Sequence, residues 1–218
     1  MHHIGPRSKD LMKPIQFLKF YEEWHKYRLE NEWLQRSVTQ VLGTSLSDDA
    51  KANIMRYKDG PDGWAARGGA LHGVVESFLK GQELVYAERW TDWVDPLIEC
   101  DLFKDCEVIA TEYRLCDKRK SLGGSFDFLI KRSNGEIVLG DVKTVSSQSA
   151  ARRRKPAKEQ LGAYAAMLCD HHPALPIDKC VTVVSAPNEC KVIEQRVDDC
   201  LESWVDSWDK YQFMLEDW

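Results

Sequence analysis

Long apolar runs are missing from this 218-residue sequence, and no stretch of eighteen apolar residues occurs in it. A membrane-spanning helix needs about twenty such residues, so none is predicted. The first residues also lack the apolar stretch of a signal peptide. We therefore expect an intracellular, cytoplasmic location, a description that includes a phage-infected host cell or an organelle.

Closely spaced cysteine pairs are missing too. The seven cysteines are Cys100, Cys106, Cys116, Cys169, Cys180, Cys190 and Cys200, and none forms a C-x-x-C pair. An odd count without close pairs argues against a zinc ribbon and against a secreted disulfide scaffold. We expect reduced thiols, most of them buried.

A basic excess is also absent, since the formal net charge is −5. This balance argues against a surface coated in cations, but it allows a local basic groove, because phosphate binding depends on where Lys and Arg cluster. With 43% hydrophobic residues, the chain can bury a core. No repeat or linker divides it, and we expect a single domain over residues 1–218.

Hydrophobic periodicity gives the order of the expected elements. Residues 14–27 can continue as one helix, whereas residues 25–35 can form a hairpin that turns at Glu30-Asn31, and both readings stay open. Ser47 can cap a short helix that ends near Gly60. Further helices are expected over 62–81, 87–103, 155–170 and 198–218, with strands over 106–116, 123–132, 136–145, 178–187 and 190–197. This order predicts an α/β fold with a mixed central sheet, a helical N-terminal addition over 1–60, a core over 61–200 and a closing helix over 201–218. We expect the termini and residues 145–155 to be the least ordered parts.

Charged residues interrupt an otherwise apolar hairpin, GSFDFLIKRSNGEIVLGDVKT, over residues 124–144. Asp141 and Lys143 are two residues apart and share one face of a strand, and the turn at Asn134-Gly135 brings Asp127 beside them. Two converging carboxylates repel unless a cation lies between them, and Mg²⁺ or Mn²⁺ prefers such oxygen ligands. The alternative is a partly buried ion pair between Lys143 and one of the aspartates.

Four blocks then support a resemblance to a family. They are RGGALHGVVE with His72, TEYRL with Glu112, the hairpin with Asp127, Asp141 and Lys143, and EQLGAYA with Gln160 and Tyr164. In this order they resemble the PD-(D/E)XK nucleases, specifically the RecB-type branch that includes phage, recombination and organellar exonucleases. SVTQVLG, residues 37–43, resembles the family's opening segment, and the blocks span about three-fifths of the chain.

The resemblance implies a restriction-endonuclease-like core that hydrolyses phosphodiester bonds with one or two Mg²⁺ or Mn²⁺ ions. The metal ligands that it implies are Asp127, Asp141, His72 and the backbone carbonyl of Val142. Glu112 would be a nearby catalytic carboxylate, and Lys143 would activate the attacking water. Gln160 and Tyr164 would orient Lys143 or contact phosphates.

Each implied residue also has a structural interpretation. His72 can be a hydrogen-bonded core residue, Tyr164 a core aromatic, and Glu112 a partner for Arg114. Glu76, which shares a helix face with His72, is left outside the predicted site.

A basic run follows the hairpin and precedes the Gln160 helix. It consists of Arg152, Arg153, Arg154 and Lys155, with Lys158 beyond. Such a run is often only a solvated loop, but its position at the edge of the predicted site favours contact with nucleic acid. Arg67 and the basic turn over 117–120 can extend the track.

The expected function is that of a metal-dependent DNA exonuclease in phage or organellar-type replication, recombination or repair. Its partner is DNA, single- or double-stranded and with ends preferred, and replication or recombination proteins can join it. An iron–sulfur cluster is not expected, because no cysteine precedes residue 100 and the last four lie ten or eleven residues apart. A structure-selective endonuclease and a non-catalytic nucleic-acid-binding module are the alternatives.

Overall fold

A mixed six-stranded sheet forms the centre of the computed structural model, which describes residues 12–60 and 62–216. Its strands are β4 (Arg36–Ser37), β5 (Glu107–Asp117), β6 (Leu122–Lys131), β7 (Ile137–Thr144), β8 (Lys179–Ala186) and β9 (Glu189–Gln195). Strand β6 runs antiparallel to both of its neighbours β5 and β7, β8 is parallel to β7, and β9 is antiparallel to β8. The predicted hairpin is confirmed, with Gly135 at φ +92° in the turn between β6 and β7.

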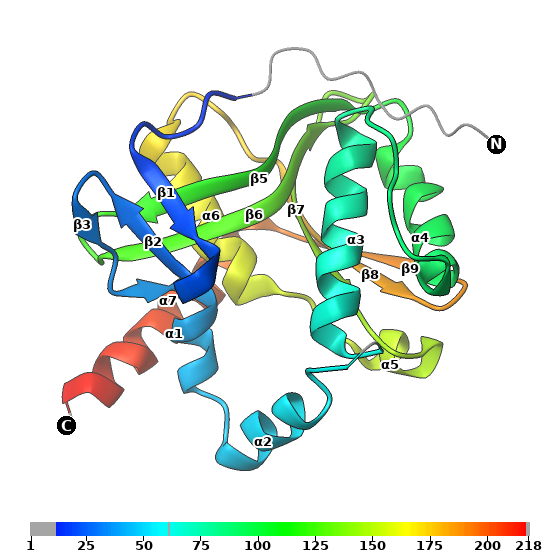
Figure 1. Cartoon of the computed structure of the whole chain (residues 1–218). Helices are drawn as coiled ribbons and strands as arrows, with labels where there is room; N and C mark the ends of the chain where they lie inside the picture. Colours follow the sequence, from blue (N-terminus) through cyan, green and yellow to red (C-terminus); the bar gives the residue numbers. More distant parts are fainter. Residues whose placement is uncertain (1–11, 61, 217–218) are drawn as a thin grey trace.

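Helices cover both faces of this sheet, as Figure 1 shows. On one side, α3 (Trp64–Leu79) and α4 (Thr91–Ile98) pack on buried residues such as Phe128 and Val142. On the other, α6 (Lys158–His171) and α7 (Val197–Glu216) pack on Phe126 and Leu139. The predicted α/β class with a mixed sheet and flanking helices is confirmed. Short 3₁₀ turns, η2 (Glu88–Trp90) and η3 (Asp101–Phe103), flank α4.

The N-terminal part differs from the predicted helical addition. Residues 18–33 form a small antiparallel sheet of β1 (Leu18–Tyr21), β2 (Lys26–Leu29) and β3 (Glu32–Trp33), with the 3₁₀ turn η1 (Glu22–Trp24) between β1 and β2. The hairpin at Glu30-Asn31 is therefore correct and the single helix over 14–27 is wrong. Alternating Leu18, Phe20, Tyr27 and Leu29 bury one face of this sheet, which a helix could not do with the same spacing.

Two short helices connect the small sheet to α3. Helix α1 (Val38–Thr44) begins with a capping box between Ser37 and Gln40, and α2 (Asp48–Arg56) begins at the predicted cap Ser47. No residue of α2 is buried. Helix α1 packs into the core through Val38 and Val41, whereas α2 is an outer connection, seen at the bottom of Figure 1.

Residues 145–155 are more regular than predicted, because α5 (Gln148–Arg153) begins at the Ser147 cap within them. Of the predicted poorly ordered termini, residues 1–11 and 217–218 lie outside the described residues. Across the described ranges, every helix is too short or too polar to span a bilayer. The seven cysteines carry free thiols, and Cys106, Cys116, Cys180 and Cys200 are buried, as expected.

Candidate metal centre

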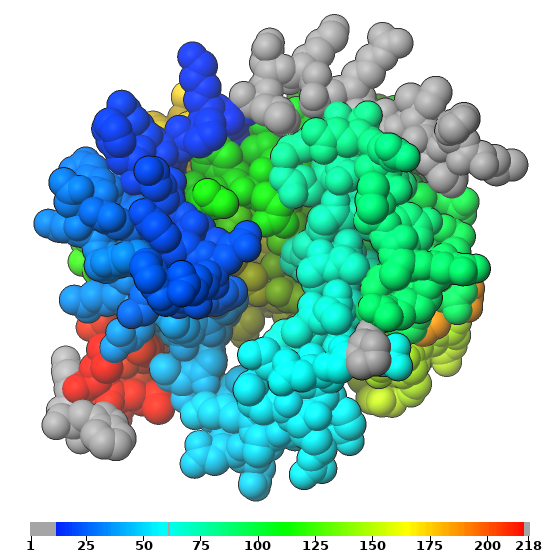
Figure 2. Space-filling model, viewed as in Figure 1, coloured from blue at the N-terminus to red at the C-terminus, as the bar shows by residue number. Residues whose placement is uncertain are grey.

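An open cleft of about 1130 Å³ separates the small N-terminal sheet from α3. The cleft is lined by residues of the small sheet and η1, of helices α1, α3 and α6, and of strands β4, β5, β6 and β7, so residues far apart in the sequence meet there. Figure 2 shows this hollow between the blue N-terminal residues and the cyan to blue-green surface of α3. Six of the thirteen predicted site residues line the cleft, and they are His72, Glu112, Asp127, Lys143, Gln160 and Tyr164.

The side of helix α3 that faces the cleft carries three glycines. Gly68, Gly69 and Gly73 all line it, and a Cβ atom at any of them would have no neighbour within 4 Å. Each glycine costs a helix about 1 kcal/mol relative to alanine, so packing inside the protein does not explain their presence. They leave the helix backbone open to the cleft around His72.

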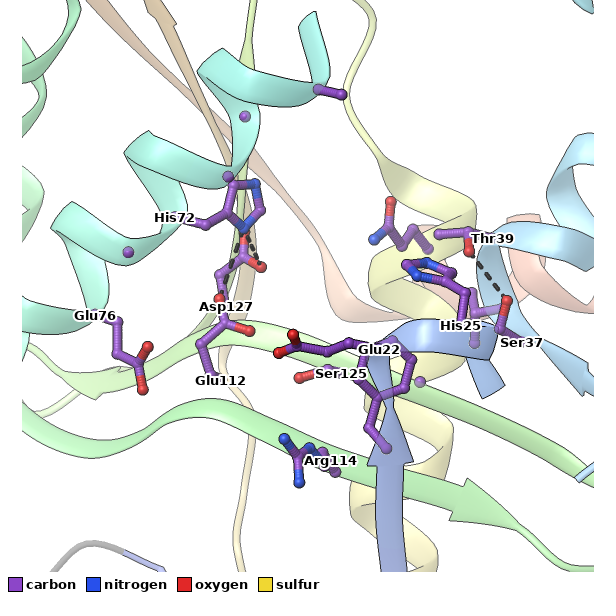
Figure 3. Close-up of a pocket in the computed structure, with 18 of the residues that line it drawn as sticks. Glu22, His25, Ser37, Thr39, His72, Glu76, Glu112, Arg114, Ser125 and Asp127 are labelled. Carbon is purple, nitrogen blue, oxygen red and sulfur yellow. Dashed lines mark hydrogen bonds and ion pairs between the residues drawn. The ribbon is translucent and has the colours of Figure 1, made fainter. Parts of the chain in front are cut away.

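His72 is the point at which two strands and a helix converge. Its Nδ1 atom lies 3.1 Å from Oδ1 of Asp127 on β6 and 3.6 Å from Oε1 of Glu112 on β5. One ligand atom from each of the three residues falls within 4.8 Å of the others. Figure 3 shows the imidazole descending from α3 toward both carboxylates. One nitrogen and two carboxylate groups form a donor set that suits a divalent cation such as Mn²⁺.

Electrostatic attraction holds His72, Asp127 and Glu112 together even without a metal ion. Burial lowers the pKa of His72, but the negative charge of Asp127 and hydrogen bonds to Asp127 and Glu112 outweigh burial and raise that pKa to about 10. The imidazole is therefore protonated at neutral pH and acts as the cation between the two acids.

Glu112 has a special backbone conformation, with φ at +44° in the middle of β5. Its neighbours Thr111 and Tyr113 pair with Phe128 and Phe126, so Glu112 lies opposite Asp127. A left-handed residue inside a strand costs about 1–3 kcal/mol and is typical of functional sites. Glu112 is one of the three residues of the cluster, and the resemblance implied a nearby catalytic carboxylate at this position.

Asp127 lies at a fork in the sheet, which is the point where the paired strands β6 and β7 separate. The ladder between β6 and β7 ends at Phe128 and Gly140, and β4 pairs with β6 only at Leu122 and Gly123. Asp127 Oδ2 accepts the backbone N–H of Val142, which lies just beyond that ladder. The predicted role of the Val142 carbonyl as a metal ligand stays a prediction.

Asp141, which follows Gly140 at the same fork, is completely buried and turns to a different partner. Lys143 Nζ lies 2.9 Å from Asp141 Oδ2 and donates a hydrogen bond to Oδ1 at 3.2 Å. Among the described residues, Oδ2 itself accepts no hydrogen bond. Asp141 is therefore outside the cluster of converging ligands, and the predicted ion pair with Lys143 exists beside that cluster.

A chain of hydrogen bonds extends from this pair into α6. Lys143 Nζ also donates to Gln160 Oε1 at 2.8 Å, and Gln160 Nε2 donates to the Tyr164 hydroxyl at 2.9 Å. The prediction that Gln160 orients Lys143 agrees with this contact. Burial, followed by the negative charge of Asp141, raises the pKa of Tyr164 well above its usual value, so the hydroxyl stays protonated. Burial likewise raises the pKa of Asp141, while Lys143 opposes the shift.

The basic run lies beside a second cavity rather than in the main cleft. Arg154 and Lys155 line this cavity of about 700 Å³ together with Lys158, and Lys143 and Gln160 line both spaces. All four residues of the run are exposed, including Arg152 and Arg153 at the end of α5. The cations are therefore free to meet a ligand that passes Lys143.

Arg67 does not have the predicted role of an exposed phosphate contact. Its side chain is buried, its Nε donates to Thr144 Oγ1 at 3.3 Å, and its guanidinium lies over the ring of Trp93. It sits on the side of α3 that packs against the sheet, and its role is structural.

Two residues of the turn in the small sheet also line the cleft, and the sequence did not predict them. Glu22 and His25 lie at the two ends of η1. Figure 3 shows Glu22 extending from η1 toward Glu112 and Asp127. No motif marks these positions, because a turn between two short strands brings them to the cleft.

Comparisons with known proteins do not indicate a function. No protein-family model matches the sequence, and no curated protein shows significant similarity to it. The crystal structure of SSO0001 resembles this chain at 18% identity and a TM-score of 0.42, over 78% of this chain and 73% of that one. At these values the likeness is weak, and a function has to be inferred from the geometry of the cleft.

Proposed function

We propose that this protein is a metal-dependent DNA nuclease that hydrolyses phosphodiester bonds in the cleft and works as an exonuclease. The observation that supports this proposal most is that His72, Glu112 and Asp127 converge on the floor of an open cleft, with the Asp141–Lys143 pair behind them. An ordinary core would not gather three carboxylates and two cations at a fork in its sheet. The resemblance of the sequence blocks to PD-(D/E)XK nucleases supports the same reading.

The residues fit a hard or borderline divalent cation. His72, Glu112 and Asp127 would hold it, and the Asp141 carboxylate beside them is already paired with Lys143. When bound, Mg²⁺ or Mn²⁺ would polarise the phosphate and lower the pKa of a water molecule. His72 would have to give up its proton to serve as a ligand, since one nitrogen cannot carry both.

Lys143 is the residue that we assign to transition-state stabilisation. Its ammonium lines the cleft and is fixed from two sides, by Asp141 and by Gln160. A fixed cation beside the reacting phosphate stabilises the negative charge that develops there and can position a water for attack. Gln160 is a positioning residue, because it acts through Lys143.

The two cavities suggest a path for the substrate. Both are lined by Lys143 and Gln160, and the second adds Arg154, Lys155 and Lys158. Phosphates that leave the cleft past Lys143 would meet these cations, which gives the acidic protein a local basic track. We assign the activity to DNA replication, recombination or repair on the strength of the sequence resemblance.

Cleavage of end-labelled linear DNA and of closed circular DNA in Mg²⁺, Mn²⁺ or EDTA tests the proposal. We expect degradation of linear DNA that needs the metal and that Asp127→Asn reduces by at least a hundredfold. Asp101→Asn is the matched control, because Asp101 is an exposed aspartate in an ion pair with Lys104, outside the cleft. Cleavage in EDTA, or full activity of Asp127→Asn, would refute the mechanism, and cutting of closed circles would replace the exonuclease with an endonuclease.

A further inference from the structure

The small N-terminal sheet has one face that nothing in the described part of the chain covers. Strand pairing places Lys19 opposite Arg28 and Arg28 opposite Trp33, while Tyr21 lies opposite Lys26. Directly paired residues point to the same side of a sheet, so these five side chains share its outer face. The inner face, with Leu18 and Leu29, is buried.

Aromatic rings on this outer face gather into one cluster. Trp24, from η1, lies nearly parallel to Tyr21 with ring centroids 5.8 Å apart, and Trp33 lies 5.0 Å from Tyr21 and 5.4 Å from Trp24. Trp24 and Trp33 nevertheless remain 53% and 42% exposed. Exposing two indoles costs hydrophobic free energy, which is typical of a surface that binds a partner.

Cations surround these rings. Lys19 and Lys26 are exposed, and the Arg28 guanidinium lies 5.8 Å from the Trp33 ring centre. Exposed aromatic faces alternating with Lys and Arg are the arrangement with which proteins hold single-stranded nucleic acid, since bases stack on the rings and phosphates pair with the cations. A duplex keeps its bases stacked on one another and cannot use such rings.

The cluster adjoins the cleft through η1. Trp24 is the last residue of η1, and Glu22 and His25 at the two ends of the same turn line the cleft. Figure 1 shows the small sheet opposite α3, and Figure 3 shows Glu22 and His25 among the residues that line the cleft. A strand bound on the outer face can therefore continue over η1 toward Asp127.

We infer that the outer face of the β1–β3 sheet, formed by Lys19, Tyr21, Trp24, Lys26, Arg28 and Trp33, binds single-stranded nucleic acid and leads it into the cleft. This inference rests on the proposed function and specifies its substrate as a single strand or the frayed single-stranded end of a duplex. The face provides stacking without base-specific hydrogen bonds, so binding depends little on sequence.

Binding in EDTA isolates this step from cleavage. The fluorescence anisotropy of a labelled 20-nucleotide DNA strand, and of its blunt duplex, is measured with wild type, Trp24→Ala, Trp33→Ala and Phe213→Ala. We expect each tryptophan variant to weaken binding of the single strand by about fivefold or more and to change duplex binding less than twofold. Phe213→Ala is the matched control, because Phe213 is a 66%-exposed aromatic on α7.

Photo-crosslinking of wild type with the same strand carrying 4-thiothymidine gives a second readout that needs no variant to fold. Crosslinks within residues 18–33 support the inference, and crosslinks confined to other segments overturn it. Unchanged single-strand affinity in both tryptophan variants also overturns it, even if the protein degrades DNA and the proposed function stands. A selective loss of affinity in a protein that never cuts DNA supports this face while the proposed function fails.

Discussion

Replacing Lys143 by methionine measures how much the Asp141–Lys143 ion pair contributes to the stability of the fold. Asp141 is completely buried, and its charged partner is the Lys143 ammonium at 2.9 Å. Removing one member of a buried ion pair costs about 3–5 kcal/mol, because the other charge is left uncompensated. The Lys143 side chain is 23% exposed, so water can partly replace it, and we expect the lower end, about 3 kcal/mol. For a chain of this size, that loss lowers Tm by about 6–12 °C.

The double variant Asp141→Asn/Lys143→Met supplies the control for this prediction. It removes both charges of the Asp141–Lys143 pair and leaves neither of them buried without its partner, so we expect its stability to return to within about 1 kcal/mol of wild type. The deficit of Lys143→Met should also shrink as the pH falls from 8 to 5. Burial raises the pKa of Asp141, so the folded single variant binds a proton that the unfolded chain releases, and acid favours the fold.

Thermal melts in EDTA at several pH values measure these differences. Equal stability of wild type and Lys143→Met, or a double variant that is no better than the single one, would refute the buried-pair account.

Three further predictions concern the cleft. Gly73→Ala should raise the free energy of unfolding by about 1 kcal/mol, because the added Cβ has no neighbour within 4 Å. The same methyl group narrows the cleft and should slow DNA cleavage, so faster cleavage would contradict this prediction. Gln160→Leu should slow DNA cleavage by about ten- to a hundredfold, because Lys143 loses its hydrogen bond to Gln160. Tyr164→Phe should slow it less, since Tyr164 acts through Gln160, and cleavage rates equal to that of wild type would contradict a role for these hydrogen bonds. In EDTA the ion pair of His72 with Asp127 should stabilise the protein fully below pH 6.5 and lose that effect as the pH rises toward about 10. Tm of wild type should therefore fall over this range more than Tm of His72→Gln, and parallel Tm curves would contradict the ion pair. In a separate titration without EDTA, Mn²⁺ binding should tighten over the same range, because His72 loses its proton.

Periodicity predicted most of the fold because its elements follow local rules. The alternation in residues 106–116 and 123–132 fits strands with one or both faces buried, and Ser47 caps a helix as expected. The small sheet over residues 18–33 was harder, since its strands are only two to four residues long and the turn η1 interrupts them. Runs this short carry too few apolar positions to separate a period of two from one of 3.6.

The site was predictable as a set of residues but not as a set of contacts. Alternation on a strand brought Asp127, Asp141 and Lys143 together, and spacing on a helix paired Gln160 with Tyr164. The spacing of residues could not indicate that the ladder between β6 and β7 ends at Phe128. Beyond this point Asp127 contacts His72, whereas Asp141 pairs with Lys143.

Two other features of the site depend on tertiary structure. The left-handed backbone of Glu112 in β5 has no local signal, because a glutamate does not favour that conformation. The burial of Arg67 against Trp93 and Thr144 also had none, since an arginine in a helix next to glycines looks exposed in sequence.

Anomalous diffraction from a crystal soaked in Mn²⁺ tests the metal centre most directly. We expect a manganese peak within bonding distance of His72 Nδ1, Asp127 Oδ1 and a carboxylate oxygen of Glu112, and no such peak in Asp127→Asn. A soaked crystal with no peak at this cluster, from protein whose DNA cleavage still requires Mn²⁺, would contradict it.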